Sequence, residues 1–374
     1  MHIEKYSNTI RAWRFCPMCN HVCPVIKVTK NEANGPRGLA LSLFLVSEKM
    51  RQFDEPRVER IYQCTTSGIC EAWSLGDYDL SGMVLAGRAD VVDQGKAPPS
   101  AVKTQKNVEN MQNPFGEAKE TRSRLFAELT EESGSKKKAE VLYFMGCTTT
   151  YRQPEIAKAS VKILHKAGVN FTLLEDEPCC GAPLYELGFR EHARREARDL
   201  SQLIAKSGCN QVITSCPHCY RALKEWYPQL GVQLPAGVEV KHTADYFSGL
   251  AKDRKIRLSK RSEIVTYHDP CYLGRFGKVF EQPRELIKEV SGPNFKEMKW
   301  NREKALCCGA GGGMSFTNPR IAAQIEATLI GEASKTGSEI LITACPLCSD
   351  NLASSREKLK FQDISQFLAD SLAS

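Results

Sequence analysis

The pattern of apolar and polar positions repeats along the chain from Val141 to the end. Two apolar runs, "VLYFMGC" and "IVTYHDPC", each predict a strand that leads directly into a cysteine. Each run is followed by a helical pattern, a CCG triplet, a second helical pattern and another strand that ends in CxxC, "QVITSCPHC" and "EILITACPLC". Strands that alternate with helices predict an α/β tandem repeat with parallel sheets.

One of these helical patterns is regular enough to be placed by its spacing. Apolar residues recur every three or four positions at Phe189, Ala193, Ala197, Leu200 and Ile204, with arginines between them. This spacing predicts an amphipathic helix over residues 189–206, with a basic outer face.

The strand runs also predict where the cysteines meet. In parallel sheets, ligands bind outside the carboxyl ends of the strands. The cysteines that follow the four strand runs, Cys147, Cys216, Cys271 and Cys345, are therefore expected at one rim.

The rest of the chain divides into two further regions. Residues 1–95 are predicted to be mostly helical, because "GPRGLALSLFLVSEKM" combines a helix start with a dense apolar stretch. Residues 96–138, with "GKAPPS", "NPFG" and "SGSKKK", are predicted to be a linker. The repeat units then span residues 139–252 and 263–374.

The amino-acid composition restricts the classes of function that the chain can have. The chain has 374 residues, of which 42% are hydrophobic, so it can bury a core without disulfides, yet it holds 16 cysteines. No signal peptide and no transmembrane segment are recognised, which predicts a cytoplasmic protein whose cysteines hold metal or do redox chemistry. The net charge of +7 and the lack of an aromatic–basic patch argue against nucleic acid and favour an acidic protein partner.

Each repeat unit holds five cysteines in the same frame. Unit one has Cys147, Cys179, Cys180, Cys216 and Cys219, and unit two has Cys271, Cys307, Cys308, Cys345 and Cys348. Zinc and cubane iron–sulfur clusters each take four ligands, so a fifth thiolate suggests a cluster in which one sulfur bridges two irons. Gly181 and Gly309 are predicted to let the backbone pass close to that cluster. A zinc site remains the second interpretation, and Cys209, outside both frames, is interpreted as structural.

These motifs resemble the cysteine-rich CCG family. It includes the B and D subunits of heterodisulfide reductase and the iron–sulfur subunits of glycolate oxidase and anaerobic glycerol-3-phosphate dehydrogenase. The segment "YHDPCYLGR" is similar to the opening of the family's second unit. The resemblance implies two non-cubane [4Fe–4S] clusters, each bound by the five cysteines of one unit.

Relatives with this layout begin with a ferredoxin-like domain, whose motif C-x2-C-x2-C-x3-C-P occurs twice. Here only five of its eight cysteine positions are kept, Cys16, Cys19, Cys23, Cys64 and Cys70, while Trp13, Ser67 and Ser74 occupy the others. The motif's exchange of fourth ligands groups Cys23, Cys64 and Cys70 with Ser67. One cubane cluster drawn from the five thiols is favoured, with a metal-free docking domain as the alternative.

The likeness predicts an iron–sulfur electron-transfer subunit of a larger oxidoreductase. Because no flavin or nicotinamide fingerprint appears in the sequence, the expected partner is a flavoprotein dehydrogenase or a heterodisulfide reductase A-like subunit. The acceptor is expected to be a quinone, a ferredoxin or a disulfide, and any membrane association is expected to come through partners. Catalytic disulfide reduction in this chain is the alternative, and a zinc-stabilised scaffold is the second.

Three more residues are interpreted individually. His218, between the ligands of a CxxC, is interpreted as an exposed spacer. Asp269 is expected to cap its loop, and the role of His268 is left open between loop orientation and proton transfer.

Overall fold

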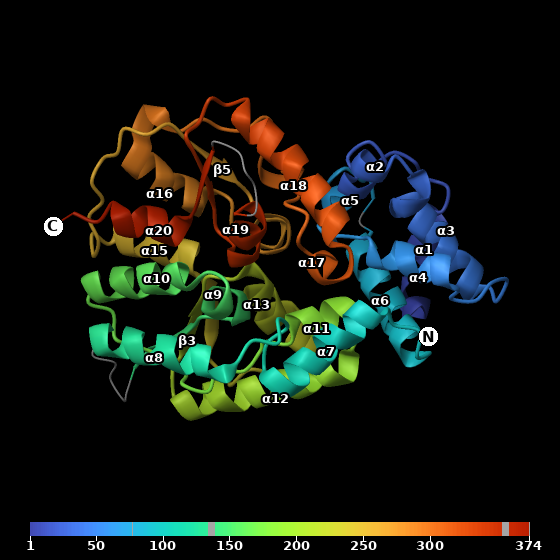
Figure 1. Cartoon of the computed structure of the whole chain (residues 1–374), viewed down its shortest axis with the longest axis horizontal. Coiled ribbons are helices and arrows are strands. Elements are labelled where there is room, and N and C mark those ends of the chain that lie inside the picture. Colours follow the sequence, from blue (N-terminus) through green and yellow to red (C-terminus); the bar gives the residue numbers. More distant parts are fainter. Residues whose placement is uncertain (77, 134–138, 354–358, 374) are drawn as a thin grey trace.

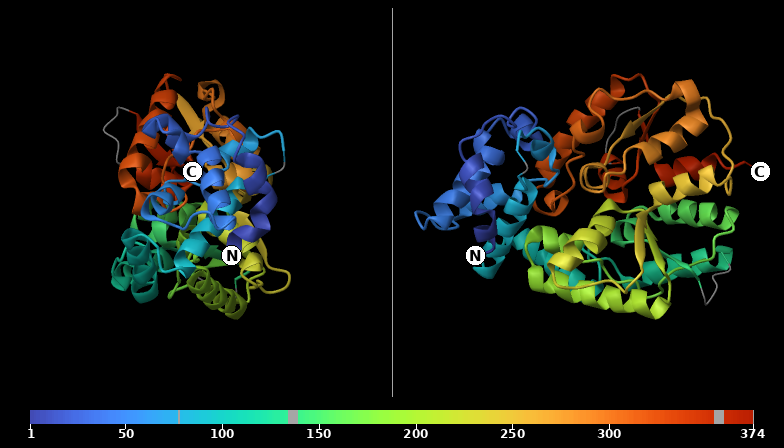
Figure 2. Two further views of the ribbon diagram at one scale, coloured as in Figure 1. Left: turned by 90° about the vertical axis from the view of Figure 1, so that its right-hand side faces the viewer. Right: turned by 180° about the vertical axis from the view of Figure 1, so that it is seen from behind.

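The computed structural model describes residues 1–76, 78–133, 139–353 and 359–373, and places two α/β units side by side with a helical domain at one end (Figure 1). The view from behind shows the same three parts, with the helical domain against both units (Figure 2). The two predicted repeat units are therefore neighbours in space as well as in sequence.

The N-terminal domain is helical, as the apolar stretch after Pro36 predicts. Proline stands at the first turn of α2 and α3, where its missing N–H costs nothing, and Asp54 and Asp79 cap α4 and α6 by accepting backbone hydrogen bonds. The elements are η1 His2–Tyr6, α1 Ser7–Trp13, α2 Pro24–Thr29, η2 Glu32–Asn34, α3 Pro36–Ser47, α4 Glu55–Tyr62, α5 Ile69–Ala72 and α6 Leu80–Asp93.

The segment predicted as a linker, 96–138, is largely helical and packed. It forms α7 (Pro99–Met111) and α8 (Lys119–Ser133). The prolines that predicted a break in structure stand at the start of α7, where proline is tolerated. Leu125 and Leu129 of α8 join a buried core, which periodicity alone did not single out. The predicted lysine run at 136–138 lies outside the described residues.

Unit one contains a parallel sheet of order β2-β1-β3-β4, which confirms the predicted class. Its strands are β1 Val141–Phe144, β2 Phe171–Thr172, β3 Gln211–Thr214 and β4 Glu239–His242. Its helices are α9 Cys147–Tyr151, α10 Pro154–Lys166, α11 Ala182–Leu187, α12 Arg190–Ser207, α13 Pro217–Arg221, η3 Ala222–Trp226, α14 Tyr227–Gln229 and α15 Thr243–Lys252. The periodicity of residues 189–206 is thus confirmed as α12.

Unit two repeats this order with the parallel sheet β5-β6-β7. A single parallel bridge from Val265 to Phe295 stands where β2 pairs with β1 in unit one. The strands are β5 Val265–His268, β6 Ile340–Thr343 and β7 Lys360–Asp363. The helices are η4 Tyr272–Phe276, α16 Glu281–Ser291, η5 Gly292–Asn294, η6 Arg302–Lys304, α17 Met314–Thr317, α18 Pro319–Ser334, α19 Pro346–Leu352 and α20 Ile364–Asp370.

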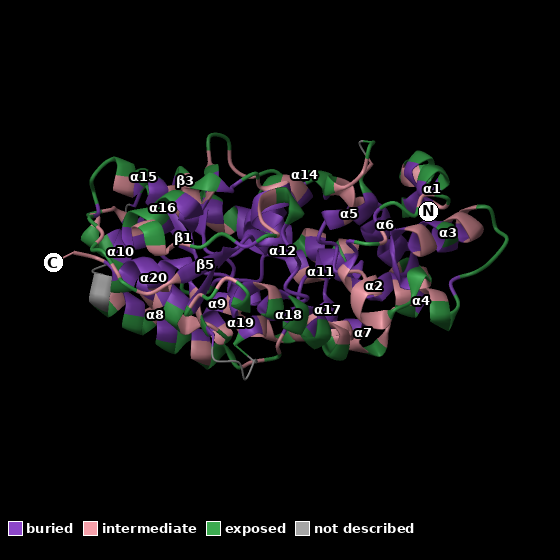
Figure 3. Ribbon diagram, turned by 90° about the horizontal axis from the view of Figure 1, so that it is seen from above, coloured by how far each residue is buried: buried purple, intermediate pink, exposed green. Residues whose placement is uncertain are grey.

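The two units pack through an exchange of helices. The closing helix of unit one, α15, packs on α16 of unit two, and the closing helix of unit two, α20, packs on α10 of unit one. These helices lie together at the end of the molecule away from the N-terminal domain, on the left of Figure 1. One buried cluster contains residues from both sheets, among them Tyr143 and Tyr267, and buried residues run through the interior from end to end (Figure 3). The repeat units therefore share a core.

A buried arginine joins all three parts. The side chain of Arg88, on α6, is fully buried and donates five hydrogen bonds of 2.6–3.1 Å to four backbone carbonyls. Two of these carbonyls belong to the N-terminal domain, Ile61 and Cys64, while Glu186 belongs to unit one and Gly312 to unit two. The planar guanidinium can satisfy these groups together, which an ammonium with its three donors cannot.

We expect Arg88→Met to lower the free energy of unfolding by at least about 3 kcal/mol, because several buried carbonyls lose their donor at about 1–3 kcal/mol each. Arg88→Lys should fall between this variant and the wild type. Urea unfolding measures the change, and Arg198→Met, at an exposed position of α12, is the matched control. Equal stability of the Arg88 and Arg198 variants would contradict this role.

Candidate metal centres

Each sheet carries a buried group of five thiols at its carboxyl edge. Cys147 and Cys216 follow β1 and β3, and Cys271 and Cys345 follow β5 and β6, so the four strand-end cysteines lie at the rims of two separate sheets instead of the one rim expected. All ten cysteines of the two frames are buried and free of disulfides. The structure thus brings together both sets of residues that the spacing predicted.

The thiols of each group contact one another in the same order. In unit one the hydrogen-bonded series is Cys147, Cys179, Cys180, Cys219, Cys216. In unit two it is Cys271, Cys307, Cys308, Cys348, Cys345. In both units the adjacent pair lies in the middle of the series, so one cysteine of the pair faces the strand-end cysteine and the other faces the CxxC motif.

These contacts make the thiols chemically unequal. Cys180 accepts hydrogen bonds from Cys179 and Cys219, which lower its pKa to about 7. Cys307 accepts from Cys271 and Cys308, and its pKa is lowered as well. Each site therefore favours a thiolate, the form in which cysteine binds metal.

In unit one the five thiols line a cavity of about 30 Å³. Unit two also contributes to the lining of this cavity, through Ala310, Gly313, Phe316 and Leu347. In unit two the thiols are in close contact, with the Sγ atoms of Cys308 and Cys348 3.1 Å apart. Five soft, buried sulfur donors at each site fit a thiolate-bound iron–sulfur cluster, and their number exceeds the four ligands of a zinc centre.

An acidic residue that the sequence analysis did not single out supports the first site. Glu177 is buried, and its carboxylate accepts hydrogen bonds from the amides of Met145 at 2.9 Å and Gly146 at 2.7 Å, just before Cys147. Burial raises the pKa of Glu177 to about 7. Its place two residues before the CCG was the only signal that the sequence offered.

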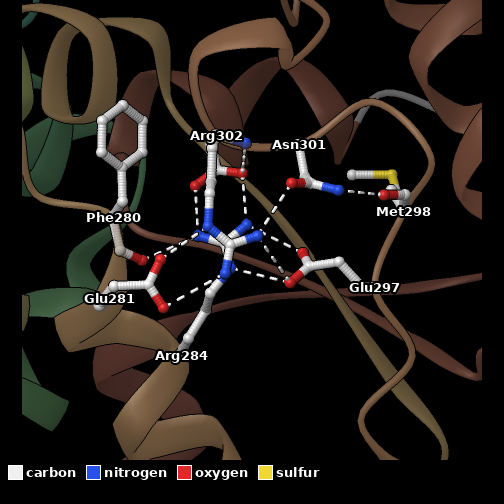
Figure 4. Close-up of polar contacts among 8 residues, drawn as sticks. Phe280, Glu281, Arg284, Glu297, Met298, Asn301 and Arg302 are labelled. Carbon is white, nitrogen blue, oxygen red and sulfur yellow. Dashed lines mark hydrogen bonds and ion pairs between the residues drawn. The ribbon is translucent and has the colours of Figure 1, made fainter.

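In unit two the equivalent support is an ion pair. Arg284 is fully buried and binds the carboxylate of Asp269 through two hydrogen bonds of 2.6 and 2.7 Å. Asp269 also accepts from the amide of Arg302, and Glu297 and Glu281 extend the network (Figure 4). The carboxylate of Asp269 therefore ties the loop before Cys271 to two other segments, whereas capping of its own loop stays a prediction.

Backbone conformation and close packing explain why a glycine follows each cysteine pair. Gly181 and Gly309 adopt φ values of +78° and +98°, which favour glycine. A Cβ atom would lie 3.2 Å from the carbonyl oxygen of Ala193 and 2.4 Å from that of Ala322, respectively. The close approach that they permit is therefore to the backbone of α12 and α18, which sets the position of the cysteine pairs.

His218 is not the exposed spacer that was expected. Its side chain is 8% exposed, its Nδ1 lies 3.1 Å from the carboxylate of Glu186, and its ring centre lies 4.4 Å from that of Tyr272 of unit two, with the two rings tilted by 38°. Burial opposes protonation, but the Glu186 carboxylate raises the pKa of His218 to about 9. Partners distant in sequence decided this position, which the CPHC spacing could not reveal.

The N-terminal cysteines fall into two sets. Cys23, Cys64 and Cys70 line a second cavity, again of about 30 Å³, together with Ser67. This is the grouping that the ferredoxin motif predicts when the two runs exchange their fourth ligands. The thiol of Cys19 is buried and interacts with those of Cys23 and Cys70, while Cys16 is partly exposed.

The other four positions of the motif do not surround a similar space. Trp13 is buried in the core, edge-on to Tyr78. Ser74 donates to the carbonyl of Gly76 within its own turn. Cys16 and Cys19 are thus left without two further ligands at the expected places.

The three-thiol cavity adjoins unit two. Cys23 and Cys307 belong to one buried cluster, to which Met314 and Ile325 also contribute. The guanidinium of Arg275, next to Cys271 in space, donates to the carbonyl of Ser67 at 3.1 Å. The N-terminal thiols therefore lie beside the thiol group of unit two.

Comparison with known proteins agrees with this geometry. The cysteine-rich CCG domain matches residues 141–224 and 265–353. The chain is 33% identical over 350 residues to the D subunit of the dihydromethanophenazine:CoB–CoM heterodisulfide reductase of Methanosarcina barkeri, across 91% of this chain and 84% of that one. The chain belongs to the CCG family.

Other similar proteins differ from this chain in length. An EtfAB:quinone oxidoreductase of Syntrophomonas wolfei is 29% identical over 86% of this chain and 48% of its own. A hypothetical protein of Helicobacter pylori has a similar fold, with a TM-score of 0.53 at 7% identity, over 100% of this chain and 76% of its own. Among the described residues, no helix combines the length and the apolar character needed to cross a bilayer. This CCG-family chain is thus similar to a heterodisulfide reductase subunit and to other oxidoreductases, one of which, from Bacillus subtilis, is named as iron–sulfur-binding.

Cys209 offers a test of where the frames begin and end. It is buried, and its thiol donates to the carbonyl of Ala139 at 3.3 Å, away from both sites. We expect Cys209→Ser to leave the metal content of the anaerobically prepared protein unchanged, because serine keeps a donor. Cys216→Ser, in the frame, should lower it. An equal loss in both variants, measured by iron and zinc analysis, would contradict the frame.

Proposed function

We propose that this chain is an iron–sulfur electron-transfer subunit of a multi-subunit oxidoreductase. In this proposal the ten CCG cysteines bind two non-cubane [4Fe–4S] clusters, and the N-terminal domain is ferredoxin-like and binds one cubane. The observation that carries the proposal is the pair of buried five-thiol groups with the same order of contacts. A bound iron–sulfur cluster supplies one-electron transfer.

The chain's own residues have three tasks in this role. The thiolates hold the metal, with the second cysteine of each pair facing the CxxC motif. The shared core keeps water away from both sites. Arg122 near Cys147 and Arg275 near Cys271 offset the negative charge that several thiolates bring together.

The positions of the three sites support an order for electron passage. The N-terminal thiols adjoin unit two through Cys23 and Cys307. Unit two in turn adjoins unit one through Tyr272 and His218 and through the wall of the first cavity. We infer a path from the N-terminal site to unit two and then to unit one, or the reverse.

The ends of this path belong to partners. A flavoprotein dehydrogenase or a heterodisulfide reductase A-like subunit is the proposed donor, and a quinone or a ferredoxin the proposed acceptor. The relation to an EtfAB:quinone oxidoreductase supports a flavoprotein-linked role. We propose that the chain works in the cytoplasm and reaches a membrane only through partners.

Catalytic disulfide reduction is the second candidate, favoured by the relation to the D subunit of a heterodisulfide reductase. In that reaction a disulfide takes up two electrons and two protons, the S–S bond breaks, and two thiols leave. A reduced, reconstituted chain that cleaves a disulfide without a partner protein would establish this candidate. A chain that transfers electrons only to a protein acceptor would favour the relay.

Metal analysis tests the cluster assignment and its zinc alternative. We expect the anaerobically prepared chain to contain iron and acid-labile sulfide, and Cys180→Ala and Cys308→Ala each to lose the signal of one site and keep the other. Removing a central thiol breaks the series of contacts in its own unit only. Zinc without labile sulfide would support the scaffold and end the proposal.

The N-terminal domain is expected to hold one cubane signal. In the full chain, Cys64→Ala should remove it, because this thiol lines the three-cysteine cavity. Cys16→Ala, at the partly exposed position, is the matched control and should keep it. Electron paramagnetic resonance distinguishes the two results.

Restoring the missing cysteines tests whether the N-terminal domain keeps the geometry of the ferredoxin motif. Joint conversion of Trp13, Ser67 and Ser74 to cysteine restores eight thiols and should raise the iron content towards a second cubane. Two coupled cubanes in the wild type would show that the five-thiol interpretation is wrong.

A further inference from the structure

The two thiol sites differ at the end of their first strand. Strand β1 ends at Phe144, paired in register with Thr214, and β5 ends at His268, paired with Thr343. These two positions are therefore equivalent, three residues before the first cysteine of each frame. Both side chains are buried, so one site has an aromatic hydrocarbon where the other has an imidazole.

His268 has no protein partner of its own. It is 1% exposed, and among the described residues neither of its ring nitrogens meets a hydrogen-bonding group. The neighbouring Asp269 is occupied by Arg284. A ring nitrogen of His268 and the Sγ atoms of Cys308 and Cys348 all lie within 4.8 Å of one another.

The chemistry of a buried imidazole restricts the interactions that His268 can make. Leaving a buried polar group without a hydrogen-bond partner is unfavourable, so a partner for the ring is expected. A neutral imidazole has one N–H donor and one acceptor nitrogen, so the ring can donate one hydrogen bond. The acceptors in reach are the sulfurs of Cys308 and Cys348.

We propose that His268 donates a hydrogen bond to a sulfur of the unit-two site and gives that site a higher reduction potential than the unit-one site. This inference rests on the proposed iron–sulfur function. A donor stabilises the negative charge that a site gains on reduction, and hydrogen bonds to sulfur are among the groups that set cluster potentials. Phe144 offers no donor, so the repeated frames hold two unequal sites.

Unequal reduction potentials of the two CCG sites would make unit two the preferred site for an electron in the proposed relay. If both CCG sites held clusters, the first electron supplied to them would rest at unit two, and unit one would be reduced by a further electron.

Exchange of the two residues tests the proposal in the full, anaerobically prepared chain. His268→Phe copies unit one and should shift the potential of the unit-two signal to a more negative value, with the unit-one signal unchanged. Phe144→His should shift the unit-one signal to a more positive value. Redox titration followed by electron paramagnetic resonance measures both, with Cys180→Ala and Cys308→Ala assigning the signals.

Two further measurements keep the test informative if His268→Phe loses its cluster. His268→Asn and His268→Gln place an amide N–H near the two ring-nitrogen positions, and at least one should retain the wild-type potential. In protein labelled with ¹⁵N-histidine, pulsed electron paramagnetic resonance should show a weak coupling between a labelled nitrogen and the unpaired electron of the unit-two site. A strong coupling would mean that His268 binds iron directly and would overturn the donor assignment.

Failure of this inference can be distinguished from failure of the proposed function. Unchanged potentials in both exchange variants, with normal iron and sulfide, would overturn the role of His268 and leave the proposed function intact. Absence of iron and sulfide from the wild type would end the proposed function instead.

Discussion

Every thiol site in the repeat units depends on one constraint, that the strands of a parallel sheet all end at the same edge. Cys147 and Cys216 are far apart in sequence, yet each follows a neighbouring strand and so reaches the same rim. The CCG pair is then brought to that rim by a glycine that packs against the next helix. Five sulfurs meet without any disulfide, because the sheet fixes two of them and helix packing fixes the others.

Bringing many thiols together also requires that water be excluded and charge be offset. The exchange of α15 and α20 between the units closes a shared core around both sheets. Arg88 satisfies carbonyls from all three parts of the chain, and Asp269 and Glu177 hold the loops before the strand-end cysteines. These buried polar groups are costly unless every partner is in place, so they tie the geometry of the sites to the fold as a whole.

The repeat makes two similar sites but not two equal ones. Unit one has a cavity walled by residues of unit two, whereas unit two has His268 and the adjoining N-terminal cysteines. The same frame in different surroundings can hold the same kind of metal group at different potentials. In the proposed relay, such a difference would make one site the more easily reduced of the two, and repetition of the motif alone would not produce it.

The sequence by itself determined the repeat, the parallel α/β class, helix α12 and the ten-cysteine frames, because these follow from local periodicity and spacing. Only the tertiary structure decided which groups surround the thiols. Residues 96–138 are largely helical because Leu125 and Leu129 find a core, and His218 is buried because Glu186 and Tyr272 are brought to it. Arg284, Glu177 and Arg88 matter through partners that are close in space but distant in sequence, or through backbone groups that carry no residue-type signal. A pattern along one chain records which side chains are available, whereas their surroundings depend on how separate segments pack.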